Sequence, residues 1–129
     1  MQVTKEKLLW DALELFRASP DHSKYSADDI HKYLVVPIEY NTLRIYYKNN
    51  KPVGLVSWCW LDDEQSDLFL NDKYHPTGED HQYDNSKKLW VMEFIAPYGD
   101  TREVFKLTKE ECIATYGPTN VNFRRFHSR

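Results

Sequence analysis

The chain has 129 residues and a formal charge of −3, with 41% hydrophobic and 29% charged residues. Its four Trp, nine Tyr and six Phe residues exclude a disordered chain, and the negative balance leaves no global basic footprint for nucleic acid. No apolar run reaches the roughly 18 residues of a membrane span, and a chain of this length builds about one core, so we expect one domain over residues 1–129.

Capping signals and apolar spacing predict two helices in the first third of the chain. Thr4 is a plausible N-cap for the first helix, whose apolar residues recur at helical spacing until residues 19–20. Ser26 and Asp29 have the spacing of a capping box and begin the second helix. Proline restricts the residue before it, so we expect Pro37 to end that helix.

The hydrophobic period then changes from about 3.6 residues to 2, which is typical of strands. Residues 42–48 alternate between apolar and polar side chains, and Asn49-Asn50 suits a tight hairpin turn. Residues 53–61 are apolar on both faces, which predicts a central strand. Asp62 then begins a short helix.

The second half contains a long polar segment, a strand and a helix. We expect residues 72–88 to form the most mobile interior loop, and residues 89–96 to form the next strand. A helix begins at Asp100 and is expected to break near Thr108, where a second capping box occurs; residues 121–127 can form a last strand. The order of elements predicts a mixed α/β (α+β) fold on a largely antiparallel sheet flanked by helices.

The cysteine and histidine patterns give no metal site. Cys59 and Cys112 fall in predicted core elements and indicate buried thiols in a reducing compartment; the N-terminus does not resemble a signal peptide, so we expect a cytoplasmic protein. His75, Asp80 and His81 could bind a metal, but a solvated polar loop is the preferred interpretation.

Glu93 is the most informative residue by pattern alone. Strict alternation places it on one strand face with Leu89, Val91 and Ile95, where a carboxylate must be paired or its pKa must rise. Either that face is exposed or ion-paired there, or Glu93 orients a histidine in a cleft. His22, in the loop between the first two helices, is a candidate partner, and together they would make a general-base pair. Only their contact in the fold can establish the pair.

Large aromatic residues mark the predicted core, and arginines mark the C-terminus. We expect substantial burial of Trp58, Trp60, Trp90 and Phe94. The arginines are expected to form a solvated tail or to dock an acidic protein: Arg124, Arg125 and Arg129.

Three segments resemble the toxin-activating lysine acyltransferases, which modify RTX toxins. That family's G-x-x-S-W-x-x-L stretch matches Gly54, Ser57, Trp58 and Leu61. Its W-x-x-D-x-x-A-P-F-G-D block matches Trp90, Glu93, Ala96, Pro97, Tyr98, Gly99 and Asp100, with Glu in place of Asp at 93. Its S-P-x-H matches Ser19, Pro20 and His22.

The resemblance implies a GNAT-like fold and transfer of an acyl group to the lysine of a protein substrate. The acyl donor would be a co-substrate, acyl carrier protein or acyl-CoA, with no bound cofactor, and the family suggests a homodimer. The family's catalytic His and Asp correspond to His22 and Glu93. The candidate substrate-binding residues are Ser19, Ser57, Trp58 and Trp90.

The expected reaction uses His22 to accept a proton from the lysine amine, or to be acylated first, while Glu93 holds the imidazole. The thioester would lie against splayed central strands, residues 53–61 and 89–96. The alternative is a catalytically altered interaction or inhibitor protein that binds a host or partner protein, which the Asp-to-Glu replacement leaves open.

Overall fold

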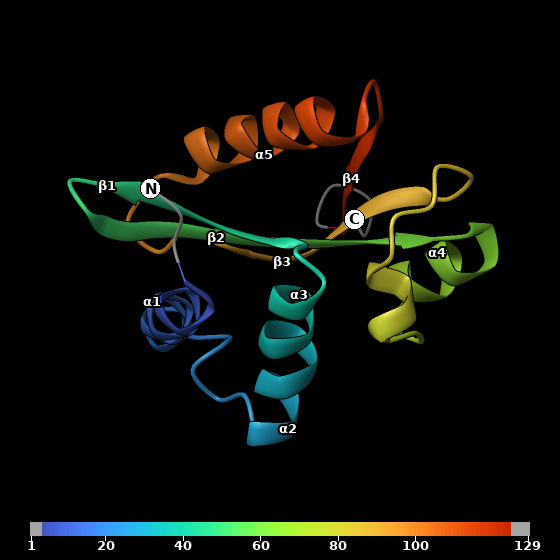
Figure 1. Cartoon of the computed structure of the whole chain (residues 1–129). Helices are drawn as coiled ribbons and strands as arrows, with labels where there is room; N and C mark the ends of the chain where they lie inside the picture. Colours follow the sequence, from blue (N-terminus) through green and yellow to red (C-terminus); the bar gives the residue numbers. More distant parts are fainter. Residues whose placement is uncertain (1–3, 125–129) are drawn as a thin grey trace.

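The computed structural model describes residues 4–124, which form a four-stranded sheet with helices on both faces (Figure 1). The strands lie in chain order, and the first three are antiparallel, whereas the last pair is parallel. This confirms the predicted mixed α/β fold on a mostly antiparallel sheet. The strands are β1 (Leu43–Lys48), β2 (Lys51–Leu61), β3 (Lys88–Ile95) and β4 (Val121–Phe123).

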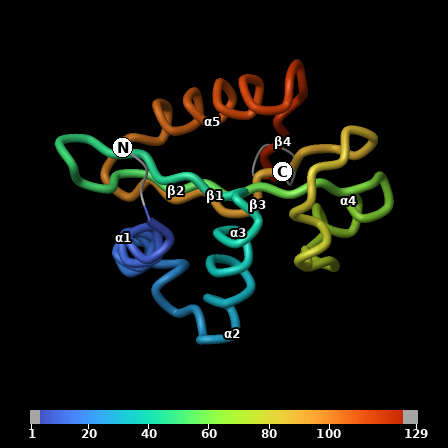
Figure 2. Tube along the Cα trace, viewed as in Figure 1, coloured from blue at the N-terminus to red at the C-terminus, as the bar shows by residue number. Residues whose placement is uncertain are grey.

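The helices divide between the two faces of the sheet. One face carries α1 and the connected segment from α2 to α3, the other carries α5, and α4 lies at the end opposite the β1–β2 hairpin (Figure 2). The α-helices are α1 (Lys5–Ala18), α2 (Ala27–Ile30), α3 (Val36–Glu39), α4 (Asp63–Leu70) and α5 (Thr101–Tyr116). A π-helical turn, η1 (His31–Val35), joins α2 to α3, and a 3₁₀ turn, η2 (Gly78–His81), interrupts the long loop.

The predicted helix starts are confirmed, but the predicted stop at Pro37 is wrong. Thr4 caps α1, and Ser26 forms a capping box with Asp29 at the start of α2. The helix continues through Pro37 to Glu39. In a regular α-helix the proline ring would clash with a carbonyl of the preceding turn, and the wider π-helical turn before Pro37 changes the position of that carbonyl.

The β1–β2 hairpin and the central position of β2 agree with the sequence. Asn49 and Asn50 have φ of 51° and 64°, the left-handed conformation that asparagine tolerates in a tight hairpin. β2 pairs with strands on both sides, and Trp58, Trp60 and Trp90 are buried as predicted, although Phe94 is only partly buried. Both cysteines are free and buried.

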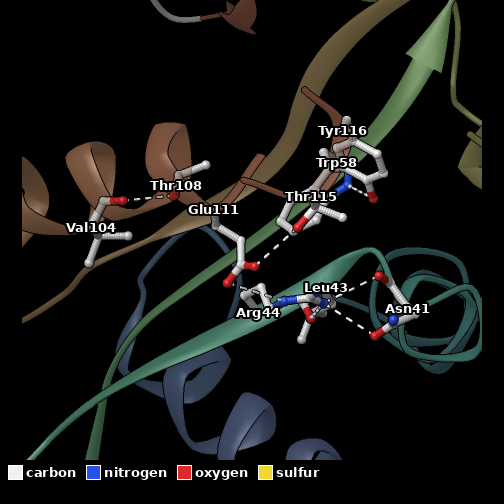
Figure 3. A network of polar contacts seen from close by, with 9 residues as sticks. All are labelled: Asn41, Leu43, Arg44, Trp58, Val104, Thr108, Glu111, Thr115 and Tyr116. Atoms are coloured by element: carbon white, nitrogen blue, oxygen red, sulfur yellow. Dashed lines mark hydrogen bonds and ion pairs between the residues drawn. The ribbon is translucent and has the colours of Figure 1, made fainter. Parts of the chain in front are cut away.

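Helix α5 lies across β1 and β2 and is continuous, so the predicted break at Thr108 is wrong. The buried Thr108 hydroxyl donates to the Val104 carbonyl of its own helix at 2.7 Å, and the capping spacing is not used (Figure 3). Arg44 of β1 pairs with Glu111 at 3.5 Å and lies over the Trp58 ring, which anchors the helix to the sheet.

A β-bulge in β3 reverses the faces that simple alternation assigns to this strand. Ser57 pairs with Glu93 and Trp58 with Val91, so Met92 is an extra residue on β3. Val91 therefore packs with the core under α5, whereas Glu93 lies on the face that carries α1. The prediction that Glu93 shares a face with Leu89 and Val91 is wrong, because one inserted residue exchanges the two faces.

The loop after α4 is anchored in the protein interior, contrary to the expected solvated loop. Asp80 and His81 are 4% and 2% exposed. The Asp80 carboxylate accepts hydrogen bonds from the Thr77 backbone and the Tyr74 hydroxyl, and His81 Nδ1 lies 3.0 Å from the Trp58 carbonyl. The mobility expected for residues 72–88 stays a prediction for the parts outside this anchor.

The last strand is shorter than predicted within the described residues. β4 ends at Phe123, and the prediction for residues 125–127, like those for Arg125 and Arg129, lies outside the described part of the chain. Arg124 does not extend freely into solvent, because it pairs with Asp72 at 2.9 Å. In residues 4–124, none of the helices combines the length and the apolar character that crossing a membrane requires.

Candidate active site

His22 lies in the tight turn that leads from α1 to α2. Its backbone amide donates to the Ser19 carbonyl at 3.0 Å, and the Tyr25 amide donates to the His22 carbonyl at 3.1 Å. The imidazole packs against the Phe16 ring, with ring centroids 5.2 Å apart. Two backbone hydrogen bonds and one aromatic contact thus fix the imidazole beneath the sheet.

The imidazole meets Glu93 across 71 residues of sequence. His22 Nε2 lies 2.6 Å from Glu93 Oε2, and the two side chains are 13% and 9% exposed. This confirms the predicted contact between the two residues. An ionised carboxylate only accepts hydrogen bonds, so Nε2 carries the hydrogen and donates to Glu93.

The second ring nitrogen of His22 is also occupied. Ser19 Oγ lies 2.7 Å from His22 Nδ1. With the hydrogen on Nε2, Nδ1 holds the free lone pair and accepts from the Ser19 hydroxyl. The nitrogen available as a base is therefore Nδ1, and Ser19 lies directly at it.

Tyr25 is the site residue that the sequence analysis missed. Its hydroxyl donates to Glu93 Oε1 at 2.9 Å, so both carboxylate oxygens have partners. Burial, followed by the adjacent Glu93 carboxylate, raises the pKa of Tyr25, and the same causes raise the pKa of Tyr33. A tyrosine three residues after a histidine carries no general signal of such a contact, since it depends on the path of the turn.

The other sequence-predicted site residues fall in two groups. Ser19 touches His22, and Ser57 lies opposite Glu93 in the sheet, with a buried hydroxyl that has no hydrogen-bond partner among the described residues. Trp58 and Trp90 are not brought to the His22–Glu93 pair. The Trp58 indole donates to Tyr116 at 3.0 Å, and the Trp90 indole donates to Ser66 at 2.8 Å.

A cavity of about 370 Å³ lies beside the pair. Its apolar wall is formed by Val91, Phe94 and Phe123, and its polar wall includes His22 and Glu93. The parallel pairing of β3 with β4 ends at Val91 and Phe123, so β3 continues past its neighbour here. The cavity is thus found where β3 loses its partner strand.

The expected splaying of residues 53–61 from residues 89–96 is wrong. These segments are hydrogen-bonded neighbours from Leu55 opposite Ile95 to Leu61 opposite Lys88, and only the bulge interrupts the register. An antiparallel pair that carries seven matched positions leaves no space for a ligand between its strands.

A second cavity, of about 200 Å³, adjoins the first and shares Tyr25, Met92, Glu93 and Arg124 with it. Its own lining differs, because it contains the carboxylates of Asp29 and Asp72 and the aromatic residues Tyr33 and Phe69. The Arg124 guanidinium lies 4.8 Å from the centroid of the Phe69 ring. Glu93 therefore faces one cavity with an apolar wall and one with an acidic and aromatic wall.

The described part of the chain offers no metal centre. No group of three or more His, Cys, Asp or Glu side chains between residues 4 and 124 is arranged to hold a metal ion. The polar chemistry of the site comes from one imidazole, one carboxylate and two hydroxyl groups, which together can accept, store and return a proton.

The sequence matches a known protein family and several known relatives. The model of the HlyC RTX toxin acyltransferase family matches residues 1–123. An uncharacterized protein of Synechocystis is 33% identical over 101 residues, which cover 76% of this chain and 67% of the relative.

Two relatives with activities in their names are more distant. A leukotoxin-activating lysine-acyltransferase of a Pasteurella haemolytica-like species is 24% identical over 80% of this chain and 61% of its own length. The protein-lysine myristoyltransferase HlyC of Escherichia coli is 26% identical over 75% of this chain and 55% of its own length. The chain thus spans between 55% and 67% of the length of these three relatives.

Proposed function

The chain belongs to the RTX toxin acyltransferase family, and from this premise we propose that it transfers an acyl group from an acyl thioester to the side-chain amine of a protein lysine. The observation that carries the proposal is the 2.6 Å contact between His22 and Glu93 beside a cavity with an apolar wall. The names of two relatives, a lysine-acyltransferase and a protein-lysine myristoyltransferase, support the reaction class.

His22 acts as the base in this proposal. A lysine has a pKa of about 10.4 and is mostly protonated at pH 7, so its ammonium group first loses one proton to water. The neutral amine nitrogen attacks the thioester carbonyl carbon, and a second proton passes from this nitrogen to His22 Nδ1, directly or through the Ser19 hydroxyl, which lies 2.7 Å away. Glu93 stabilises the imidazolium through the Nε2–H donor.

The imidazolium then returns the proton as the intermediate breaks down. The carbon–sulfur bond breaks, the thiolate leaves, and the proton held on His22 neutralises it. The products are an amide and a free thiol, and the site is restored without an external reductant or oxidant. In a second route, His22 Nδ1 attacks the thioester and the thiolate leaves; the lysine amine then attacks the acyl-imidazole, the imidazole leaves as the amide forms, and the proton from the amine neutralises the thiolate.

The linings of the two cavities suggest where each substrate lies. We assign the acyl chain to the larger cavity, because its apolar surface would be buried there against Val91, Phe94 and Phe123. The acceptor amine approaches Glu93 from the smaller cavity, where the Asp29 carboxylate and the Tyr33 ring attract a cation before deprotonation. Asp72 and Phe69 in the same cavity are already engaged by Arg124.

The identity of the donor and the assembly state belong to the same proposal. We propose acyl carrier protein or coenzyme A as the carrier of the thioester and a protein lysine as the acceptor. The expected homodimer and the cytoplasmic location stay predictions.

The test supplies each donor class separately. Purified protein is incubated with a myristoyl thioester of acyl carrier protein or of coenzyme A, together with N-acetyl-lysine methylamide as the acceptor, and products are followed by mass spectrometry. We expect an acylated amine and consumed thioester with at least one donor, and neither with His22→Ala. A wild-type chain that is inert toward both donors, together with tight binding to a partner protein, would support the interaction-protein alternative.

A further inference from the structure

We propose that Tyr25 is a positioning residue: its hydroxyl holds the Glu93 carboxylate in the one orientation that points Oε2 at His22. The inference rests on the proposed function, because it concerns the same base. It goes beyond the predicted pair, since the sequence analysis named no partner for the second carboxylate oxygen. The Tyr25 hydroxyl donates to Oε1 at 2.9 Å while His22 lies 2.6 Å from Oε2.

A glutamate needs such a second contact more than an aspartate does. Its additional methylene adds one rotatable bond, so the carboxylate can rotate away from the imidazole while the backbone stays fixed. Two donors on the two oxygens define both the position and the plane of the carboxylate. The Tyr25 contact thereby offsets the freedom that comes with Glu at position 93.

Tyr25 is itself held in place by rings on both sides. It packs edge-on against Phe16, with ring centroids 5.5 Å apart, and against Tyr33 at 5.7 Å. It also contacts the His22 ring at 5.1 Å. The same tyrosine thus touches both members of the pair, through its ring on one side and its hydroxyl on the other.

The hydroxyl also affects the electrostatics of the base. Burial and the Glu93 carboxylate raise the pKa of Tyr25, so it stays a donor across the neutral range. By donating to Oε1 throughout that range, it keeps the negative charge of the carboxylate fixed beside the imidazole. Other charged or titratable groups that line the two cavities around the pair are Asp21, Asp29, Tyr33, Asp72, His75 and Arg124.

The direct test removes one oxygen atom. Tyr25→Phe keeps the ring contacts and the fold, and we expect kcat to fall about 10- to 100-fold, the range for loss of a hydrogen bond to a charged group, with KM for the acyl donor within about twofold. Tyr47→Phe is the matched control, because the Tyr47 hydroxyl also donates to a carboxylate, that of Asp11 at 2.6 Å, but Tyr47 lines neither cavity. We expect that control to keep near-wild-type kcat.

A readout without turnover separates this inference from the proposed function. We expect the NMR titration midpoint of the His22 ring to move to lower pH in Tyr25→Phe, since a carboxylate that is free to rotate away stabilises the imidazolium less, and to stay unchanged in Tyr47→Phe. The acid limb of the pH–rate profile should move in the same direction. An inactive wild-type protein with this shift would reject the proposed function and keep the positioning role.

The double variant tests whether the contact is specific to Glu93. In a Glu93→Asp background the shorter side chain cannot span from Tyr25 to His22, so Tyr25→Phe should then change kcat less than twofold. An equal loss in both backgrounds, or an unchanged His22 titration in Tyr25→Phe, would overturn the proposal.

Discussion

Two histidines reach the sheet from loops, and only one of them has the surroundings of a base. His22 lies between the Glu93 carboxylate and the Ser19 hydroxyl, beside a cavity. His81 is more deeply buried, but its Nδ1 contacts a backbone carbonyl and the Thr42 hydroxyl, and its Nε2 has no partner among the described residues. Burial alone does not make a catalytic histidine; a carboxylate and an accessible space do.

The largest expected effect is loss of transfer when His22 is removed. His22→Ala should lower kcat about 1,000-fold, within the usual range for a general base, as measured with the thioester assay. His22→Gln is the control for packing, because its amide can still donate to Glu93 while it cannot act as a base. Retained activity in both variants would refute the role of His22.

Trp58, whose carbonyl holds His81, is expected to affect stability more than chemistry. Trp58→Ala should lower the free energy of unfolding by about 3–5 kcal/mol, measured by urea titration, because a fully buried indole leaves a cavity. Trp10, which is 72% exposed, provides the control, and Trp10→Ala should cost less than about 0.5 kcal/mol. A loss under about 1 kcal/mol at Trp58 would contradict the packing described for β2.

Glu93→Gln is a smaller perturbation of the His22–Glu93 pair. The amide keeps the length of the side chain but removes the charge that stabilises the imidazolium, so kcat should fall about 100-fold. The measurement is steady-state transfer, with circular dichroism to verify the fold. If kcat is unchanged, the carboxylate charge has no part in the reaction.

The smallest effect concerns His81 and pH. Burial lowers the pKa of His81, so between its folded and unfolded pKa values the unfolded chain binds more protons. The contribution of neutral His81 to stability is therefore complete above about pH 6.5, the unfolded value, and is lost as the pH falls below it, down through the lowered folded pKa.

Urea titrations between pH 7.5 and 5 test this expectation. As the pH falls, the free energy of unfolding should decrease more steeply for the wild type than for His81→Asn, by up to about 1.4 kcal/mol per pH unit. His81→Asn is the control because its amide can still donate to the Trp58 carbonyl. Parallel pH dependences of the two proteins would show that His81 titrates alike in both states.

Local rules predicted most of the elements, because caps and turns act over a few residues. Thr4, Ser26 and Asp62 start helices as their side chains indicate, and Asn49 and Asn50 form the predicted turn. The failures arise where a tertiary contact overrides the local signal. Thr108, for example, uses its hydroxyl within a continuous helix, and the loop at Asp80 is drawn into the interior.

The site could be predicted in part. His22 and Glu93 were paired through a family motif, and their contact is confirmed. Tyr25 was missed because its hydroxyl reaches Glu93 only through the backbone turn after α1, and no spacing rule encodes that turn. The face of Glu93 was predicted wrongly because a bulge has no sequence signature as regular as the alternation that it interrupts.

The face of the sheet on which Glu93 lies depends on the extra residue at Met92. Upstream of it, odd-numbered side chains of β3 point toward α5; downstream, odd-numbered side chains point toward α1. If β3 paired regularly while keeping Met92, Glu93 would turn away from His22 with neither residue of the pair altered. Deleting Met92 would instead make Val91 and Glu93 consecutive residues on opposite faces, as they are now, and would leave the pair intact. The direction of the carboxylate is thus set by one irregularity of the backbone and not by the identity of residue 93.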